Sequence, residues 1–145
     1  MIRKLFHRVF RRGHPLPSDK LSKPGLIPLA RHGIHRDSVS PGARRTCETL
    51  QKAGYSAYVV GGAVRDLIAG ITPKDYDIAT NATPDQVRAE FRRSRIIGRR
   101  FQIVHVMQGA ETLEVSTFRA AHDAHTVKDE HGRVLRDNVF GSIAE

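Results

Sequence analysis

The chain has 145 residues, a net charge of +9, one cysteine and no tryptophan. This length suits a single domain of ordinary size. The lone cysteine, Cys47, excludes an internal disulfide, and its helical setting predicts a small buried side chain rather than a reactive thiol. No apolar run approaches the ~18 residues of a membrane span, and the charged start lacks the apolar core of a secretory signal. We therefore expect a cytoplasmic protein.

Most of the positive charge lies in an N-terminal tail. Residues 1–36 carry nine Lys or Arg and one acid, whereas residues 37–145 carry fifteen and fourteen. Within residues 2–12, apolar positions recur at the spacing of a short basic amphipathic helix. Such a helix would bind an anionic membrane or a protein partner, or belong to a disordered tail, and an Arg-rich, acid-poor start also resembles an organellar presequence. Five prolines and three glycines between residues 13 and 41 predict a linker.

The stretch over residues 58–77 combines the elements that a phosphate site needs. A short apolar strand, Tyr58–Val60, runs into Gly61 and Gly62, where the backbone can turn sharply and approach a ligand. A helix that begins near Ala63 would direct its free N–H groups and the positive end of its dipole toward an anion such as a triphosphate. This order of elements predicts that the turn contacts phosphate.

Two carboxylates follow this helix. If residues 75–80 form a strand, Asp75 and Asp77 share one of its faces, with their Cα atoms about 6 to 7 Å apart. Like charges at this distance repel unless a cation lies between them, and Mg²⁺ prefers carboxylate and phosphate oxygens. The pair therefore predicts a divalent cation beside the phosphate turn.

Periodicity and capping signals predict the remaining elements of one mixed α/β domain. The expected helices cover residues 41–53, 63–69 and 84–93, and further strands cover residues 55–60, 95–97, 101–107 and 113–118. We expect a twisted sheet of about four or five strands, backed by these helices. In the last strand Glu114 lies on the face opposite Leu113 and Val115. That face is either exposed to solvent or shared with the two aspartates.

The C-terminal part has less regular patterning. Histidines at positions 122, 125 and 131 lie among acids without metal-ligand spacing, so a mobile loop is predicted there rather than a metal site. An apolar segment restarts at residues 139–143 and ends with the chain, which indicates a truncated domain.

Six motifs, taken together and in order, resemble the head domain of class II nucleotidyltransferases, the bacterial poly(A) polymerases and CCA-adding enzymes related to DNA polymerase beta. The resemblance covers about residues 32–145 and is closer to the poly(A) polymerase branch. The motifs are GGAVRD at 61–66, KDYD at 74–77, TNATPDQV at 80–87, GRRF at 98–101, EVSTFR at 114–119 and LRDNVFGSI at 135–143.

The resemblance implies addition of AMP from ATP to an RNA 3′ end during RNA processing. It implies that Asp75 and Asp77 hold two Mg²⁺ ions and that Glu114 is a third catalytic carboxylate, which favours the shared face over the exposed one. It further implies contacts with the nucleotide and with RNA phosphates. The nucleotide-binding residues would be Gly61, Gly62, Arg65 and Asp66, and the RNA-binding residues would be Arg99, Arg100 and Arg119. Arg65 would alternatively serve as a structural partner of Asp66.

Other family motifs, which select the base and hold the RNA, are absent from this sequence, so we expect weak or no activity from this chain alone. Two alternatives stay open. One is a CCA-adding enzyme that acts on tRNA. The other is a non-catalytic, basic RNA-binding or membrane-tethered adaptor.

Overall fold

The computed structural model describes residues 25–119, 127–128, 134–136 and 140. The predicted amphipathic helix at 2–12, the three C-terminal histidines and most of the apolar segment at 139–143 lie outside these residues. The elements, in chain order, are α1 Leu29–His32, the 3₁₀ turn η1 Arg36–Ser38, α2 Pro41–Lys52, β1 Ala57–Val60, α3 Gly62–Ile68, β2 Asp77–Thr80, α4 Pro84–Glu90, β3 Ser94–Ile97, β4 Ile103–Gln108, β5 Glu111–Thr117, β6 Val127–Lys128 and β7 Val134–Arg136.

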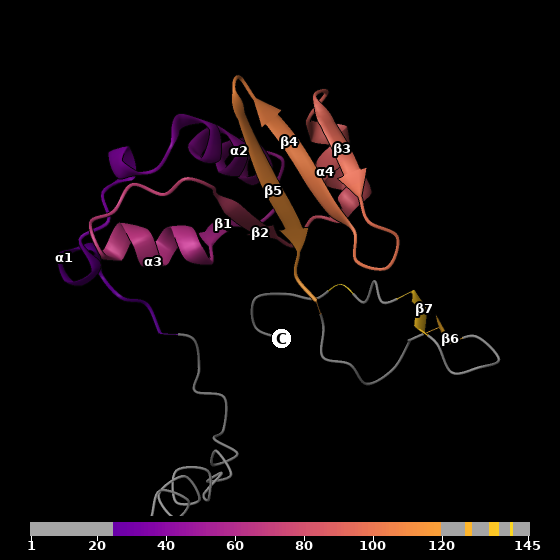
Figure 1. Ribbon diagram of the computed structural model, residues 1–145, viewed down its shortest axis with the longest axis horizontal. Coiled ribbons are helices and arrows are strands. Elements are labelled where there is room, and N and C mark those ends of the chain that lie inside the picture. The colour runs from indigo at the N-terminus through magenta and orange to yellow at the C-terminus, as the bar shows by residue number, and fades with distance from the viewer. Residues whose placement is uncertain (1–24, 120–126, 129–133, 137–139, 141–145) are drawn as a thin grey trace, which may run out of the picture.

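Five strands form one mixed sheet in the order β1-β2-β5-β4-β3, which confirms the predicted fold class (Figure 1). β2 and β5 are parallel, while the other neighbours are antiparallel. Strands β6 and β7 form a separate pair. The parallel pair at the centre of the sheet sets Asp77 opposite Glu114.

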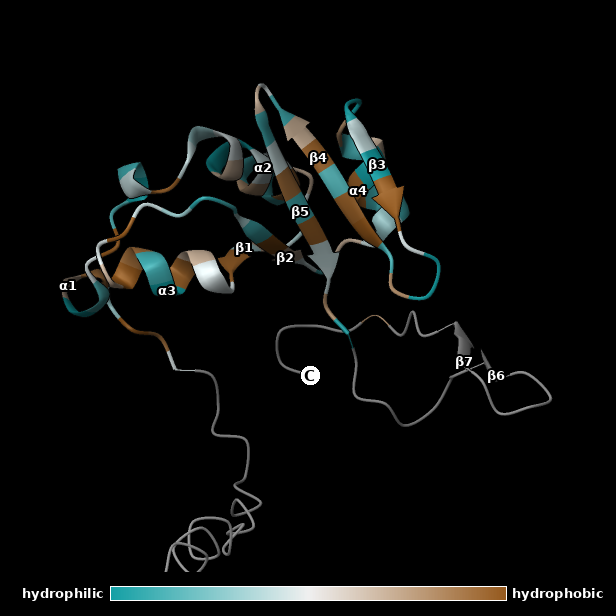
Figure 2. Cartoon of the chain, in the orientation of Figure 1, coloured by the Kyte–Doolittle hydropathy of each residue, from teal (hydrophilic) through white to brown (hydrophobic). Residues whose placement is uncertain are grey.

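Alternation along the strands divides the sheet into two faces. One face packs against α2 and α4 and forms the core, with Ile78, Val104, Val106, Leu113 and Val115 all buried. Figure 2 shows the resulting bands of hydrophobic and hydrophilic residues along β4 and β5. Because the side-chain period of a strand is two, the residues between the core positions point to the opposite face.

Local capping fixes the starts of the two core helices. The Ser40 hydroxyl accepts the N–H of Ala43 at the start of α2, and Thr83 and Gln86 form the predicted capping box at the start of α4. The Glu111 carboxylate of β5 also accepts the N–H of Gly42 at 3.1 Å. A Cβ atom at Gly42 would lie only 2.7 Å from this carboxylate, so a larger residue there would displace the Glu111 side chain.

Several predicted boundaries differ from those of the structure, and two of the differences have a long-range cause. The strand predicted from residue 75 begins at Asp77, because Asp77 pairs with Val60 and the partner strand ends there at the Gly61 turn. The helix predicted to residue 93 ends at Glu90, because Phe91 takes an extended backbone conformation and buries its ring in the core.

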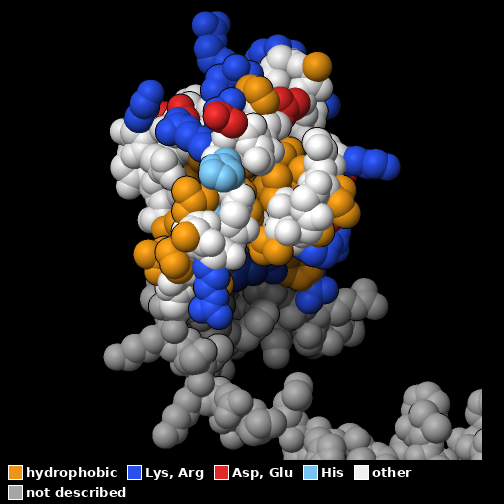
Figure 3. Space-filling model, turned by 90° about the vertical axis from the view of Figure 1, so that its left-hand side faces the viewer, with side chains coloured by type: hydrophobic (Ala, Val, Ile, Leu, Met, Phe, Trp, Pro, Cys, Tyr) orange, Lys and Arg blue, Asp and Glu red, His pale blue; other side chains and the backbone are white. Residues whose placement is uncertain are grey.

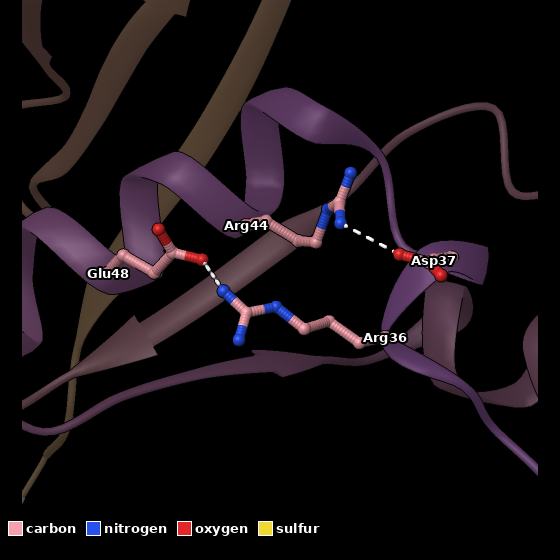
Figure 4. Close-up of polar contacts among 4 residues, drawn as sticks. All are labelled: Arg36, Asp37, Arg44 and Glu48. Carbon is pink, nitrogen blue, oxygen red and sulfur yellow. Dashed lines mark hydrogen bonds and ion pairs between the residues drawn. The ribbon is translucent and has the colours of Figure 1, made fainter.

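The predicted linker contains two short helical turns, α1 and η1. Ion pairs attach the second turn to α2, with Arg36 bound to Glu48, and Asp37 bound to Arg44 at 3.1 Å (Figure 4). These contacts join residues that local sequence patterns do not connect. They explain why this part of the linker is ordered against the domain.

An apolar groove lies between α3, β1 and the segment over residues 27–39. Val59, Val64 and Leu67 contribute to it, together with Ile27 and Ile34. Figure 3 faces the α1 end of the molecule and shows hydrophobic side chains gathered on this side. In the part of the chain that the structure describes, no helix has the length and apolar character required to cross a membrane.

Candidate active site

The glycine turn after β1 lies directly against the first strand acid. Gly61 has φ 71° and ψ −141°, a backbone conformation that residues with a Cβ avoid. A Cβ atom at this position would lie 3.1 Å from Asp77 Oδ2. Gly62 is the first residue of α3, and a Cβ there would meet Arg65 only at an ordinary 3.5 Å. The turn thus approaches Asp77 most closely at Gly61, and the predicted approach of both glycines to a phosphate ligand remains a prediction.

Three predicted carboxylates line one cavity of about 430 Å³. Asp77 of β2 and Glu114 of β5 are directly paired neighbours in the parallel ladder, and Asp75 lies in the loop that precedes β2. All three residues are exposed. The structure thus brings Glu114 to the same face as Asp77. The catalytic roles of the three acids remain predictions.

His105 is a residue of this cavity that the sequence analysis missed. Its Nε2 atom lies 3.4 Å from Glu114 Oε1, and it pairs with Glu114 across the β4–β5 ladder. The spacing of the β4–β5 hairpin could have predicted this pairing. Because only Gly109 and Ala110 separate Gln108 from its partner Glu111, the register of the two strands sets residue 105 opposite residue 114. Thr112 also lines the cavity.

A second cavity of about 380 Å³ shares Asp75 and Asp77 with the first. Its wall includes Gly62, Arg65, Asp66 and Lys74. It therefore brings two positive side chains close to the acid pair. Lys74 was part of the KDYD motif but was not predicted as a site residue, because a single lysine beside acids is usually an ordinary surface charge.

Arg65 is held by its neighbour in the sequence. Its Nε and a terminal nitrogen donate to Asp66 Oδ1 at 3.1 and 2.9 Å, while 78% of the Arg65 side chain remains exposed. This contact is the structural partnership that the sequence analysis kept as an alternative. The exposed guanidinium retains donors for a ligand, so a role in triphosphate binding remains a prediction.

The donor set fits a hard divalent cation. Among the described residues, no three His, Cys, Asp or Glu side chains already surround one point as a complete metal site would. However, Asp75, Asp77 and Glu114 offer carboxylate oxygens to one cavity, and these are the ligands that Mg²⁺ prefers. Because their side chains are exposed, rotation about side-chain bonds alone can bring their oxygens closer together.

The three predicted RNA-binding arginines lie away from both acid cavities. Arg99, Arg100 and Arg119 are exposed, and none belongs to the wall of either cavity. Arg99 and Arg100 lie in the turn between β3 and β4, and Arg119 follows β5. Their interaction with RNA remains a prediction.

Comparison with known proteins places this arrangement in a family. The profile described as "Poly A polymerase head domain" matches residues 57–139. Poly(A) polymerase I of Salmonella typhimurium is 50% identical over 126 residues, which cover 83% of this chain and 27% of the relative. A CCA-adding enzyme of Staphylococcus aureus (strain Newman) is 41% identical over 81 residues, which cover 56% of this chain and 20% of the relative.

A solved structure supports the same assignment. The Bacillus stearothermophilus CCA-adding enzyme in complex with CTP is 39% identical, with a TM-score of 0.52, over 57% of this chain and 22% of that chain. The present chain thus spans about a quarter of the length of the curated poly(A) polymerase that it matches. Because the family profile covers more than half of these 145 residues and includes the glycine turn and all three acids, the chain belongs to the poly(A) polymerase head-domain family.

Proposed function

We propose that the chain is the catalytic head of a template-independent RNA nucleotidyltransferase, which transfers AMP from ATP to an RNA 3′ hydroxyl. The observation that carries this proposal is the pairing of Asp77 with Glu114 on parallel strands, beside Asp75 and the glycine turn. The 50% identity to a poly(A) polymerase supports ATP as the nucleotide and RNA as the acceptor. Its bacterial source supports a cytoplasmic setting.

Under this proposal each of the two cavities binds one of the substrates. Lys74 and Arg65 would bind the triphosphate in the cavity that also contains Gly62, because their positive charges neutralise the negative charges of the phosphates. The RNA 3′ end would enter the cavity that contains Glu114, His105 and Thr112. Asp75 and Asp77 belong to both walls, so they lie where the two substrates meet.

The chemistry is a displacement at phosphorus. The 3′ oxygen of the RNA forms a bond to the α-phosphorus of ATP, the bond from that phosphorus to the β-phosphate oxygen breaks, and pyrophosphate leaves. Asp75 and Asp77 would hold two Mg²⁺ ions, with Glu114 as the third carboxylate beside them, and the ions when bound would lower the pKa of the attacking hydroxyl and neutralise the leaving group. The residues of this chain supply the position and orientation of both substrates.

The experiment is a measurement of ATP binding to the purified chain by calorimetry, with and without Mg²⁺. We expect the double variant Asp75→Asn, Asp77→Asn to lose at least about tenfold in Mg²⁺-dependent affinity, since the ligands of the cation are removed. Asp85→Asn, at an exposed acid of α4, is the matched control and should bind as the unmodified chain does. Undiminished Mg²⁺-dependent binding by the double variant would support the adaptor alternative instead.

Addition of CMP and AMP to tRNA is the second candidate. The 41% identity to a CCA-adding enzyme supports it. Because the motifs that select the base are absent from this sequence, the two candidates would be separated by the nucleotides that a chain including those motifs adds to oligo(A) and to tRNA. Addition of AMP alone favours poly(A) synthesis, and addition of CMP and AMP to tRNA favours the second candidate.

A further inference from the structure

An exposed aromatic ring lies against two arginines at the turn between β3 and β4. The Phe101 side chain is 43% exposed. The Cζ atom of Arg119 lies 4.2 Å from the centroid of its ring, and that of Arg100 lies 5.1 Å away. Both distances are within the range of cation–π contact. Aromatic rings and guanidinium planes are the surfaces on which unpaired nucleobases stack.

The turn fixes the backbone at residue 101, from which this ring extends. Gly98 has φ 92°, and a Cβ atom there would lie 2.2 Å from the carbonyl oxygen of Phe101. Residue 98 therefore packs against the backbone of residue 101, and only glycine permits the contact.

The open face of the sheet extends from the acids toward the end of β5, where Arg119 follows. Strand alternation and register set Tyr58, Asp77, Glu114 and Phe118 on the face opposite the core. Tyr58 is 44% exposed, and its ring centroid lies 6.3 Å from that of Phe118. Along β5, Phe118 lies about 13 Å beyond Glu114 at a rise of about 3.3 Å per residue. Arg119 of the Phe101 cluster is the next residue.

Exposed arginines also lie near the open face of the sheet and in the turn between β3 and β4. Arg95 of β3 pairs with His105 across the ladder and is exposed. Arg99, which is also exposed, directly precedes Arg100 of the cluster in the turn. Cations along a groove bind the phosphates of a single strand, while planar groups bind its bases. The combination fits single-stranded RNA, because it offers cations for the phosphates and planar groups for the bases.

We propose that Phe101, Arg100 and Arg119 form a stacking site for a nucleobase of the RNA acceptor, upstream of its 3′ end. The inference rests on the proposed function, because the acids define where that end lies. Phe118, which directly precedes Arg119 of this cluster, lies about 13 Å beyond Glu114 along the strand, and a stacked strand advances about 3.4 Å per nucleotide, so the bound base would lie roughly four or more nucleotides from the reacting hydroxyl. Arg100 and Arg119 thereby act on a base as well as on phosphate.

The absence of tryptophan from the sequence allows a direct test. Phe101→Trp makes residue 101 the sole tryptophan, and its emission should be quenched in a saturable manner when oligo(A) of about eight nucleotides stacks on it. Ile68→Trp, at a position on α3 that is 61% exposed, is the matched control and should show little quenching. A dinucleotide should quench the residue-101 tryptophan at least about tenfold more weakly, because it cannot reach from the acids to the turn.

Affinity measurements on the natural ring complete the test. Phe101→Leu should weaken oligo(A) binding by about fivefold to 100-fold, the range for loss of one base–aromatic stack, whereas Phe101→Tyr should retain binding. Thermal unfolding would verify that both variants fold. Unchanged emission from the residue-101 tryptophan, or equal affinities of the Leu and Tyr variants, would overturn the proposal. The two proposals fail separately, because ATP binding is measured without RNA and the quenching without ATP.

Discussion

The two faces of the sheet are built from the same strands but have opposite tasks. Toward α2 and α4, Leu113 and Val115 are buried among other apolar side chains. On the other face, Asp77 and Glu114 remain exposed and line the acid cavity. Burial of the first set stabilises the domain, and that stability permits like charges to lie close together on the second. Residues that stabilise the core and residues that line the acid cavity therefore alternate along the same strand.

The largest effect on stability should come from the buried face. Leu113 is 1% exposed, so Leu113→Ala should lower the free energy of unfolding by about 2 to 5 kcal/mol. Urea denaturation would measure it. The neighbouring exposed acid supplies the matched control, since Glu114→Gln should change this free energy by less than about 0.5 kcal/mol. Comparable losses from the two substitutions would contradict the division of tasks.

The reactivity of Cys47 tests how well α2 excludes solvent from the buried face of the sheet. Burial, and secondarily the negative charge of Glu48, raise the pKa of its thiol from 9.0 to about 11. The folded chain should therefore react with iodoacetamide about 100-fold more slowly at neutral pH than the chain unfolded in guanidinium, because the thiolate is the reactive form.

The same pKa shift predicts a dependence of stability on pH. Between pH 9 and about 11 the unfolded thiol has lost its proton while the folded one retains it. The thiol therefore contributes stability below pH 9, and this contribution is lost as the pH rises toward 11.

In the iodoacetamide experiment, equal reaction rates for the folded and unfolded chains would show that α2 leaves the Cys47 thiol accessible.

Gly61 should be the position where stability and ligand binding fall together. Gly61→Ala places a residue with a Cβ at φ 71° and crowds Asp77, so we expect a loss of about 1 to 3 kcal/mol in stability and weaker Mg²⁺-dependent ATP binding. Gly70→Ala is the matched control, because Gly70 has the same φ but nothing within 4 Å of its added Cβ. It should lower stability and leave ATP binding intact, whereas a loss of binding there would disprove the role of Gly61.

The smallest effect should come from the surface ion pairs of α2. Arg36 binds Glu48 but its side chain is 72% exposed, so Arg36→Ala should lower the free energy of unfolding by about 0.2 to 1 kcal/mol. Because salt screens exposed charges, the difference should shrink at high ionic strength. Denaturation at low and high salt would measure it. A loss as large as that of Leu113→Ala would mean that this pair between η1 and α2 is far stronger than an exposed ion pair should be.

Local signals predicted most of the fold. The caps at Ser40 and Thr83 act within one helical turn, and strand alternation acts between adjacent residues, so both can be read without knowledge of the partner elements. Long-range contacts accounted for the errors. Asp75 lies outside β2 because β1 ends at Val60. Similarly, η1 forms where its charged residues bind α2, more than one turn away in the sequence.

The candidate site was predicted to a similar extent. The resemblance indicated the acids because their spacing in the KDYD motif is local, and the strand pattern placed Glu114 opposite the core. His105 and Lys74 required the hairpin register and the shape of a cavity, respectively. Phe101 was part of the GRRF motif, but its contact with Arg119 depends on the chain returning along β5. The sequence analysis therefore missed residues that reach the site or the aromatic cluster only through contacts with distant parts of the chain.

The sharing of Asp75 and Asp77 between the two cavities has a thermodynamic consequence. A ligand that neutralises these carboxylates from one side lowers the repulsion that a negatively charged ligand meets on the other side. Under the proposed function, ATP with its cations and the RNA end would therefore bind cooperatively. Linkage requires this coupling to be reciprocal, so that each substrate raises the affinity of the other by the same factor.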